Sequence, residues 1–419
     1  MDFCQKKLSF YIFSPGCRTN QCDGEMLSYI LKKNAFKRAK DIENANFIII
    51  SGCVVTEKAE KEVMRFIRKA KKINPEAKIV LTGCLAERQI NAPISSIFYD
   101  LIVSNKERNF IFKILKGESV DNFNLKEEIF FSPVPRIKNK ARFFFKIQEG
   151  CNENCAYCYV RVVRGKPKSL PKEEVLKHIK KIIKNNVREI VLCGTHLGIY
   201  GKDIGYSLKE LIKEIEAIDE DFRFRLSSLE PWDLNDELLE ALINSKKFCN
   251  FFHLPLQSGS DSVLKEMRRN FTTEQYFNLV SKLKKYFSGP RIGADVIVGF
   301  PSEGEKDFLK TYEFFKKTPV DYLHIFTYSP RPNNPVLPTE NSLVLKERYK
   351  VLKELDREKR EMDKKVREGS KSQALSLGKE GILKENYYCI FEKKFKRSLL
   401  LSCKIVKWND EKAIVKILE

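Results

Sequence analysis

The sequence predicts an α/β protein in three parts: an N-terminal parallel α/β domain, a central partial barrel of (βα)6 type, and a small C-terminal all-β module. Three observations predict this order. Apolar strand-like runs alternate with amphipathic segments over residues 1–125, the alternation restarts near residue 141, and short alternating runs fill residues 371–419. A chain of 419 residues is long enough for two or three such domains.

The N-terminal domain is expected to contain three strands, at residues 8–14, 46–51 and 78–82. Helical periodicity follows the first two runs, over roughly 23–33 and 56–72. Three βα units of this kind predict a parallel sheet. Ligands of open parallel sheets gather at the carboxyl ends of the strands, so we expect residues just after these runs to lie close together.

A linker is expected over residues 126–140, and residues 141–342 then alternate strand candidates with helical segments. The six strand candidates are residues 143–148, 189–193, 222–229, 250–256, 291–298 and 322–328. Six βα units predict an open or partial barrel. Reactive groups in such folds lie at the carboxyl ends of the strands.

One charged helix is expected over residues 343–370, as a connection to the last module. Its apolar residues keep helical spacing, which predicts that one face packs on the rest of the protein. These residues are Leu345, Tyr349, Leu352, Leu355, Met362 and Val366. The tail, 371–419, is expected to be all-β because short alternating runs recur at 387–391, 399–406 and 413–418.

Six of the twelve cysteines form two sets of three. The dispersed set is Cys17, Cys53 and Cys84, each of which follows a glycine at the end of an apolar run. The compact set is the CxxxCxxC of Cys151, Cys155 and Cys158. Zinc sites usually show four ligands, whereas three thiolates suit a [4Fe-4S] cluster whose fourth iron is open to a substrate or cofactor. We read the remaining six cysteines as structural.

The formal net charge of +21 indicates a polyanionic partner such as nucleic acid, with a general abundance of lysine as the alternative explanation. No apolar run approaches the roughly 18–20 residues that span a bilayer, and no secretory signal opens the chain, so we expect a cytoplasmic protein. That compartment is reducing, which favours thiols and metal ligands over disulfides.

The compact cysteine loop, with Tyr157 before its last cysteine, resembles the radical S-adenosylmethionine (SAM) superfamily. Three further stretches resemble the cysteine motifs of the methylthiotransferase N-terminal domain. They are Gly16-Cys17-Arg18-Thr19-Asn20-Gln21, Ser51-Gly52-Cys53-Val54-Val55-Thr56 and Leu81-Thr82-Gly83-Cys84. Matching stretches continue through Arg164-Gly165, Gly194-Thr195-His196, His253-Leu254-Pro255-Leu256-Gln257, Met267-Arg268-Arg269, Asp295-Val296-Ile297-Val298 and Tyr328-Ser329-Pro330-Arg331-Pro332. The chain is therefore similar to radical SAM methylthiotransferases over residues 8 to about 365.

This resemblance implies two [4Fe-4S] clusters and SAM as both radical source and methyl donor. In the family, one SAM is cleaved to a 5′-deoxyadenosyl radical, and another methylates sulfur carried on the second cluster. The expected catalytic and metal-binding residues are Cys151, Cys155 and Cys158 for the radical cluster, and Cys17, Cys53 and Cys84 for the second. The candidate SAM-binding residues are Tyr157, Gly194, Gln257, Arg268, Asp295 and Val298, with Arg164, His196 and His253 also near the cavity.

The stretch Leu226-Ser227-Ser228-Leu229-Glu230-Pro231 resembles the subfamily that modifies threonylcarbamoyladenosine at position 37 of tRNA. The alternatives are isopentenyladenosine-37 of tRNA, a ribosomal-protein aspartate, or a non-catalytic iron–sulfur RNA-binding protein. The basic tail resembles the TRAM-like RNA-binding module of these enzymes. The resemblance further implies a tRNA anticodon loop as substrate, an electron donor such as flavodoxin or ferredoxin, no membrane association, and a monomer.

Overall fold

The computed structural model describes residues 8–418 except 55 and 120–139, so most of the expected linker lies outside the described residues. The chain forms two compact units. The first takes residues 8–119 together with 149–153 and 158–167, and the second takes 140–148, 154–157 and 168–418. The second unit contains both the central strands and the C-terminal module.

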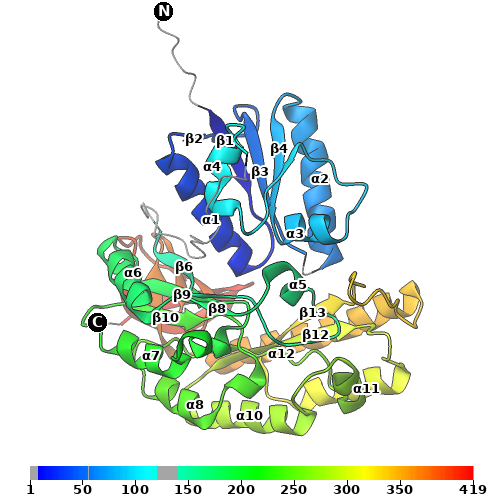
Figure 1. The fold of residues 1–419 in the computed structure, drawn as a ribbon. Coiled ribbons are helices and arrows are strands. Elements are labelled where there is room, and N and C mark those ends of the chain that lie inside the picture. The colour runs from blue at the N-terminus through cyan, green and yellow to red at the C-terminus, as the bar shows by residue number, and fades with distance from the viewer. Residues whose placement is uncertain (1–7, 55, 120–139, 419) are drawn as a thin grey trace, which may run out of the picture. The chain divides into compact units, whose positions relative to one another are not determined.

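The first unit is built on a five-stranded parallel sheet of order β2-β1-β3-β4-β5 (Figure 1). Its strands are β1 (Ser9–Phe13), β2 (Lys37–Arg38), β3 (Phe47–Gly52), β4 (Lys78–Gly83) and β5 (Leu101–Ile102). Gly52 of β3 pairs with Gly83 of β4, so these two strands end at the same level. The residues after them, Cys53 and Cys84, therefore start from adjacent points on the sheet edge.

Helices cover both faces of this sheet (Figure 1). They are α1 (Arg18–Lys33), α2 (Glu57–Ile73), α3 (Cys84–Asn91) and α4 (Ile111–Ile114), with a 3-10 turn at Arg108–Phe110. Alternate residues of β3 face opposite sides: Ile49 packs with α1 and α4, whereas Ile48 packs with α2. This alternation in a fully apolar strand is typical of a parallel sheet buried on both faces.

The central part of the second unit has six parallel strands (Figure 1). They are β6 (Arg142–Lys146), β9 (Glu189–Cys193), β10 (Arg223–Leu226), β11 (Phe251–His253), β12 (Arg291–Val298) and β13 (Tyr322–Thr327). They form two three-stranded sheets, β10-β9-β6 and β11-β12-β13. Main-chain hydrogen bonds between Phe224 and the segment before β11 join the two sheets. No ladder joins β6 to β13 among the residues described, so the barrel is partial.

Helices connect successive strands of the partial barrel. They are α6 (Lys172–Lys184), α7 (Leu208–Glu216), α8 (Asp236–Ile243), α9 (Asp261–Glu266), α10 (Thr273–Tyr286) and α11 (Glu305–Lys317). The short strands β7 (Gln148–Glu149) and β8 (Lys168–Ser169) pair on either side of the compact cysteine loop and of α5 (Val160–Arg164). The α/β fold class predicted from the sequence is thus confirmed.

The chain ends in α12 (Ser342–Arg367) and a closed five-stranded barrel of order β14-β15-β16-β18-β17. Its strands are β14 (Lys371–Ser376), β15 (Glu380–Leu383), β16 (Tyr388–Phe391), β17 (Leu400–Asn409) and β18 (Lys412–Ile417). A separate apolar core that includes Phe391 and Ile405 fills it. The all-β module is confirmed as a closed barrel. The described helices include none long and apolar enough to cross a membrane.

The predicted apolar stripe of α12 is correct only in its first half. Leu345, Leu352 and Leu355 are buried, but Met362 and Val366 are 69% and 77% exposed. Polar residues replace them on the inner face. Asp363, for example, accepts hydrogen bonds from Arg367 Nε (2.6 Å) and the hydroxyl of Tyr387 (2.7 Å). Charged residues can be buried here because they are paired. The second half of α12 therefore presents a polar face to the C-terminal barrel.

A buried ion cluster joins this barrel to the strands of the same unit. Glu189, at the start of β9, accepts hydrogen bonds from Arg223 Nε (2.6 Å), Arg225 Nε (3.0 Å) and Arg142. The far sides of Arg223 and Arg225 donate to main-chain carbonyls of the barrel, at Gln373 (2.7 Å), Ile382 (2.7 Å) and Leu383 (2.8 Å). The carboxylate of Glu189 thus orients the two arginines that bind the C-terminal barrel.

Candidate active site

The loops after β1, β3 and β4 bring Cys17, Cys53 and Cys84 together. Cys17 caps the N-terminus of α1, Cys53 follows β3, and Cys84 opens α3 directly after β4. The thiols of Cys17 and Cys53 are hydrogen-bonded, and Cys84 lies close enough to interact electrostatically with Cys17. The bond to Cys53 is the main cause that raises the pKa of Cys17 well above its ordinary value. Three thiols at one sheet edge can serve as three ligands of one centre.

Glycines before the cysteines make this close approach possible. Gly16 has φ +94°, and a Cβ there would lie 2.4 Å from the Cβ of Cys53 and 2.8 Å from its sulfur. Gly83 has φ +75°, a conformation that other residues adopt only with strain. A Cβ at Gly52 would lie 2.5 Å from the Cβ of Leu85. The glycine–cysteine pairs in the sequence therefore have a steric cause.

Asn20 ties the first of these loops to the second. Its side-chain amide donates to the carbonyls of Pro15 (2.6 Å) and Ser51 (2.5 Å), and its oxygen accepts from the Ser51 hydroxyl (2.9 Å). Pro15 and Ser51 each lie two residues before a cysteine, Cys17 and Cys53 respectively. Asn20 is fully buried, so these bonds are shielded from water and fix the spacing of the two loops.

A buried guanidinium lies beside the dispersed cysteines. Arg164, at the end of α5, donates from Nε to the sulfur of Cys84 (2.9 Å) and from Nη1 to Asp23 (2.6 Å) and Glu149. Arg108 donates to the same carboxylates, to Glu149 from Nη2 (2.8 Å) and to Asp23 from Nη1 (3.4 Å). Two arginines and two carboxylates thus form a buried network of opposite charges next to the thiols.

Arg164 is the member of this network that favours charge on the cysteine sulfur, against the effect of burial. Burial raises the pKa of the Cys84 thiol to about 11, and Arg164 acts against that rise. Burial also disfavours the charged form of Arg164, but Asp23, Cys84 and Glu149 outweigh it and raise the Arg164 pKa well above its ordinary value. Arg164 therefore stays cationic, as a partner for a thiolate must.

Arg164 also tests whether the dispersed site fits a metal–sulfur cluster. Its Nη2 group is buried and has no hydrogen-bond partner among the described residues. A buried N–H without an acceptor is costly, and cluster sulfur is an acceptor that would satisfy it. Three converging thiols and a spare N–H donor therefore fit a [4Fe-4S] cluster.

The compact set lies in an irregular loop between β7 and α5. In the first unit, the amides of Glu153 and Val160 donate to the sulfurs of Cys151 and Cys158, each at 3.4 Å. Gly150 has φ +81°, and a Cβ there would lie 2.0 Å from the carbonyl oxygen of Lys166. Amide-to-sulfur bonds of this kind stabilise thiolate ligands, as an iron–sulfur site requires.

In the second unit, Arg269 holds the middle of the same loop. Its Nη1 donates to the hydroxyl of Tyr157 (3.2 Å) and contacts the sulfur of Cys155 (3.8 Å), while Nη2 donates to Glu230 (2.7 Å) and the carbonyl of Pro255 (2.6 Å). The guanidinium also lies 4.5 Å from the ring of Trp232. Arg269 thus links the loop to the segments after β10 and β11.

The predicted SAM-binding residues fall at or near strand ends of the second unit. Gly194 follows β9, and a Cβ there would lie 2.8 Å from the side chain of Gln148. Gln257 has φ +86°, and its main chain bonds to Asp295 and Ile297 of β12. Val298 ends β12 and accepts from the amide of Tyr328. Their contact with SAM stays a prediction.

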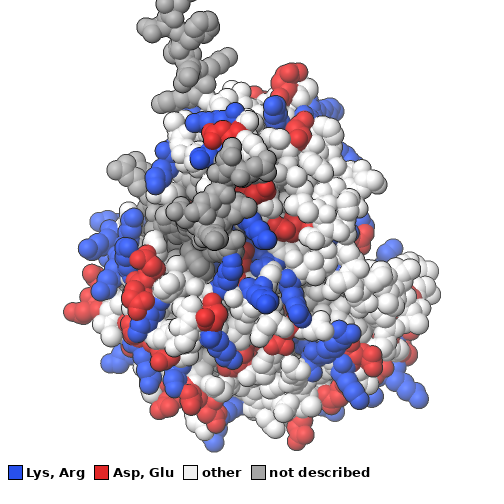
Figure 2. Space-filling view, viewed as in Figure 1, with Lys and Arg blue, Asp and Glu red and all other residues white. Residues whose placement is uncertain are grey.

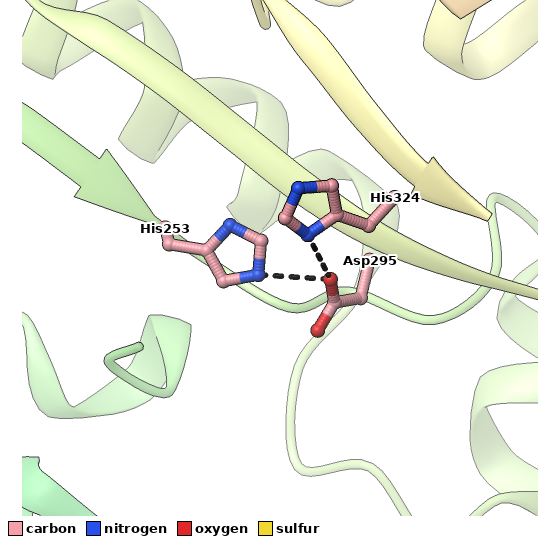
Figure 3. Close-up of side chains that lie close together, drawn as sticks. All are labelled: His253, Asp295 and His324. Atoms are coloured by element: carbon pink, nitrogen blue, oxygen red, sulfur yellow. Dashed lines mark hydrogen bonds and ion pairs between the residues drawn. The ribbon is translucent and has the colours of Figure 1, made fainter. Parts of the chain in front are cut away.

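Arg268 is exposed, whereas its neighbour Arg269 is buried and contacts the cysteine loop. His196 is bonded to Asp233 (2.7 Å), and Asp295 lies between His253 and His324 (Figure 3). Sequence reasoning missed Asp23, Arg108, Glu149, Glu230 and Arg269. Two adjacent arginines in a matching motif were the available signal for Arg269. Glu230 lies in the stretch 226–231 that resembles the threonylcarbamoyladenosine subfamily, whereas nothing in the sequence marks Asp23 or Glu149.

Lys and Arg are mixed with Asp and Glu over the face drawn in Figure 2, not gathered in one patch. On the C-terminal barrel, Lys393, Lys394, Lys396 and Arg397 are all exposed. They follow β16, whose last residue Phe391 is buried in the core of the barrel. These four cations are therefore available to phosphate groups.

Comparison with known proteins gives consistent results. The Radical SAM superfamily profile matches residues 145–315, and that of Uncharacterized protein family UPF0004 matches residues 9–104. Threonylcarbamoyladenosine tRNA methylthiotransferase MtaB of Aquifex aeolicus is 35% identical over 393 residues, 91% of this chain and 96% of the relative. tRNA-2-methylthio-N(6)-dimethylallyladenosine synthase of Clostridium botulinum is 35% identical over 355 residues, 81% of this chain and 79% of the relative.

Among solved structures, the radical SAM methyltransferase TsrM of Kitasatospora setae has a TM-score of 0.56 at 12% identity, covering 79% of this chain and 75% of that one. At this identity the likeness supports the fold alone. The superfamily match implies a [4Fe-4S] cluster and SAM. With the identity to curated relatives over most of its length, the chain belongs to the radical SAM methylthiotransferase family.

Proposed function

We propose that this enzyme converts N6-threonylcarbamoyladenosine at position 37 of tRNA to its 2-methylthio derivative. The observation that carries the proposal is the convergence of three cysteines at the sheet edge of the first unit, in addition to the radical SAM loop. A radical enzyme that inserts no sulfur has no need of a second three-thiol site. The 35% identity to MtaB proteins of two species supports the substrate.

In this proposal, Cys151, Cys155 and Cys158 hold the radical cluster, and Cys17, Cys53 and Cys84 hold a second [4Fe-4S] cluster. When bound, the clusters and SAM supply one-electron chemistry at an unactivated C–H bond, a sulfur source and a methyl group. The protein itself positions these groups. Arg269 anchors the radical loop through Tyr157 and Cys155, and Arg164 offers cationic N–H donors to sulfur at the second site.

The proposal includes the partners and the compartment. The basic residues at 393–397 of the C-terminal barrel would bind the tRNA backbone, and recognition would depend on shape and on unstacked anticodon-loop bases. An electron donor such as flavodoxin or ferredoxin would reduce the radical cluster. We expect a monomer in the cytoplasm, where thiols stay reduced.

A second candidate substrate is isopentenyladenosine-37. It is favoured by the same 35% identity to dimethylallyladenosine methylthio synthases of Clostridium botulinum. The two substrates differ in chemistry, because one side chain ends in a polar amino acid and the other is a hydrocarbon. The same fold and cysteines serve either reaction, so the distinction depends on the substrate cavity.

The test is a comparison of tRNA nucleosides from cells with and without the gene, by mass spectrometry. We expect loss of 2-methylthio-threonylcarbamoyladenosine with accumulation of its precursor, and no change in methylthiolated isopentenyladenosine. Re-expression of the wild-type gene should restore the nucleoside, and Cys53→Ala should not. Loss of only the isopentenyl product would replace the proposed substrate with the second candidate. No change in either nucleoside would contradict both.

A further inference from the structure

A polar trio of His253, Asp295 and His324 lies on one face of the sheet β11-β12-β13 in the second unit (Figure 3). His253 ends β11, while Asp295 and His324 are directly paired across β12 and β13. One ligating atom from each lies within 4.8 Å of the others. Polar groups this close on neighbouring strands form one recognition surface.

The trio shares its face of the sheet with the radical cluster loop. Side chains two residues apart on a strand point to the same side, so Ile297 and Phe326 continue the face of Asp295 and His324 toward the strand ends. Both pack in the apolar group that contains Tyr157 of the cysteine loop. The trio therefore lies two residues, about 7 Å, from that group along the strands, on the side away from the strand ends.

The hydrogen bonds in the trio leave one nitrogen available. Asp295 Oδ1 lies 2.8 Å from His253 Nε2 and 3.4 Å from His324 Nδ1, and both imidazoles face it (Figure 3). His253 Nδ1 is bonded to the hydroxyl of Tyr322 at 3.1 Å, so both nitrogens of His253 are used. His324 is 50% exposed, and its Nε2 has no hydrogen-bond partner among the described residues.

The ion pair of His253 and Asp295 fixes the charges in the trio. Burial raises the pKa of Asp295, but His253 outweighs it and holds that pKa well below its ordinary value. Burial lowers the pKa of His253, and Asp295 reverses this, so the His253 pKa is raised. Asp295 is thus an anion that accepts from Nδ1 of His324. With the ring proton on Nδ1, the exposed Nε2 of His324 is an acceptor.

We propose that this trio is the binding site for the amino-acid side chain of the substrate base, with His324 Nε2 accepting a hydrogen bond from its hydroxyl or N–H groups. The inference rests on the proposed function and explains its selectivity. A threonylcarbamoyl group supplies O–H and N–H donors to the imidazole. A dimethylallyl group supplies none and would cover His324 and Asp295 without replacing their water, which is unfavourable.

The test uses the holoenzyme with both clusters reconstituted and two anticodon stem-loop RNAs of one sequence, carrying either threonylcarbamoyladenosine or isopentenyladenosine. Dissociation constants are measured for the wild type, His324→Ala, His324→Gln and the control His178→Ala. We expect His324→Ala to weaken binding of the threonylcarbamoyl RNA about tenfold to hundredfold and leave the isopentenyl RNA unchanged. His324→Gln, which keeps an acceptor, should restore part of this preference. His178 lies on α6 outside the trio, so its variant should bind like the wild type.

The outcomes distinguish failure of the proposed function from failure of the binding site alone. If the wild type converts only the isopentenyl RNA, the proposed function and this inference both fail. If the wild type converts the threonylcarbamoyl RNA but His324→Ala keeps the full preference, or weakens both RNAs equally, the binding site alone is refuted. A preference that appears only on addition of Zn²⁺ would replace direct contact with a bound cation, because the same three atoms can ligate a metal.

Discussion

The two cysteine sites of this protein differ in how much structure each one needs. Cys151, Cys155 and Cys158 are brought near one another by one short loop, and a few bonds from Arg269, Gly165 and local amides hold it. The dispersed site requires a sheet whose strands end at the same level, glycines at the contact points and Asn20 between loops. A local site survives distant changes, whereas a dispersed site fails whenever its scaffold shifts.

The largest expected effect comes from removing one ligand at each site. Cys155→Ala should abolish both SAM cleavage and methylthiolation, since no radical forms. Cys53→Ala should abolish methylthiolation but spare SAM cleavage. The measurement is 5′-deoxyadenosine and methylthiolated product in the same reaction. Full methylthiolation by Cys53→Ala would contradict the assignment of the dispersed site.

A scaffold change should break only the dispersed site. Gly16→Ala places a methyl group 2.4 Å from the Cβ of Cys53 at φ +94°, so the loops must separate. We expect about half the iron of the wild type, with SAM cleavage retained. Gly117→Ala is the matched control, because Gly117 has φ +87° but a Cβ there would meet nothing within 4 Å. Its cost is then only about 1–2 kcal/mol of backbone strain. Equal iron loss in both variants would point to general destabilisation.

Arg164→Lys should have a subtler effect on the dispersed site. Lysine keeps the charge near Asp23 but lacks the planar fork that donates to Cys84 and carries the spare Nη2 group. Fewer N–H bonds to sulfur should lower the reduction potential of the second cluster, measured by a spectroscopically monitored redox titration. Arg108→Lys alters the same carboxylate network without touching a cysteine, so its potential should match the wild type. Matching shifts in the two variants would argue against a direct bond.

The smallest effect on chemistry should come from Glu189, which is remote from both cysteine sets in the sequence. Burial raises its pKa, but Arg225, Arg223 and Arg142 outweigh this and hold the pKa far below the ordinary 4.5. Its stabilisation is therefore present above about pH 4.5 and is lost as pH falls below it. Glu189→Gln should lower the free energy of unfolding at pH 7 by about 3–5 kcal/mol, because the arginines stay buried without a carboxylate.

The check is denaturant unfolding of both proteins from pH 7 to pH 3. Wild type and variant should converge in stability toward the acid end, and at pH 7 the folded variant should keep most of its SAM cleavage. A variant that is equally less stable at every pH would show that the carboxylate charge is not the source of the difference.

Several elements were predictable because their signal is local. The strands at Glu189–Cys193 and Arg291–Val298 are apolar runs between clear breaks, and their predicted bounds match the structure. The helix predicted from residue 23 instead begins at Arg18, because its first turn is polar and buries Asn20 and Asp23 against the site. The strands β14 and β15 were not singled out, because they gain their apolar partners only when the barrel closes.

The cysteines of the site were predictable because spacing and preceding glycines mark them. The carboxylates Asp23 and Glu149 were not, since a buried charge has no periodic signal and is tolerated only through arginines distant in sequence. The same reason explains why the second half of the apolar stripe predicted for α12 was wrong. Paired polar residues occupy the buried positions there, and Met362 and Val366 are exposed.

The bonds that hold the C-terminal barrel have a consequence for how such enzymes change over time. Arg223 and Arg225 donate to backbone carbonyls at Gln373, Ile382 and Leu383, atoms that every amino acid supplies. Substitutions on the barrel therefore leave these bonds intact provided that the strands keep their course. A lineage could replace the outward side chains of the module, including those that we propose bind tRNA, without altering the arginines that hold it.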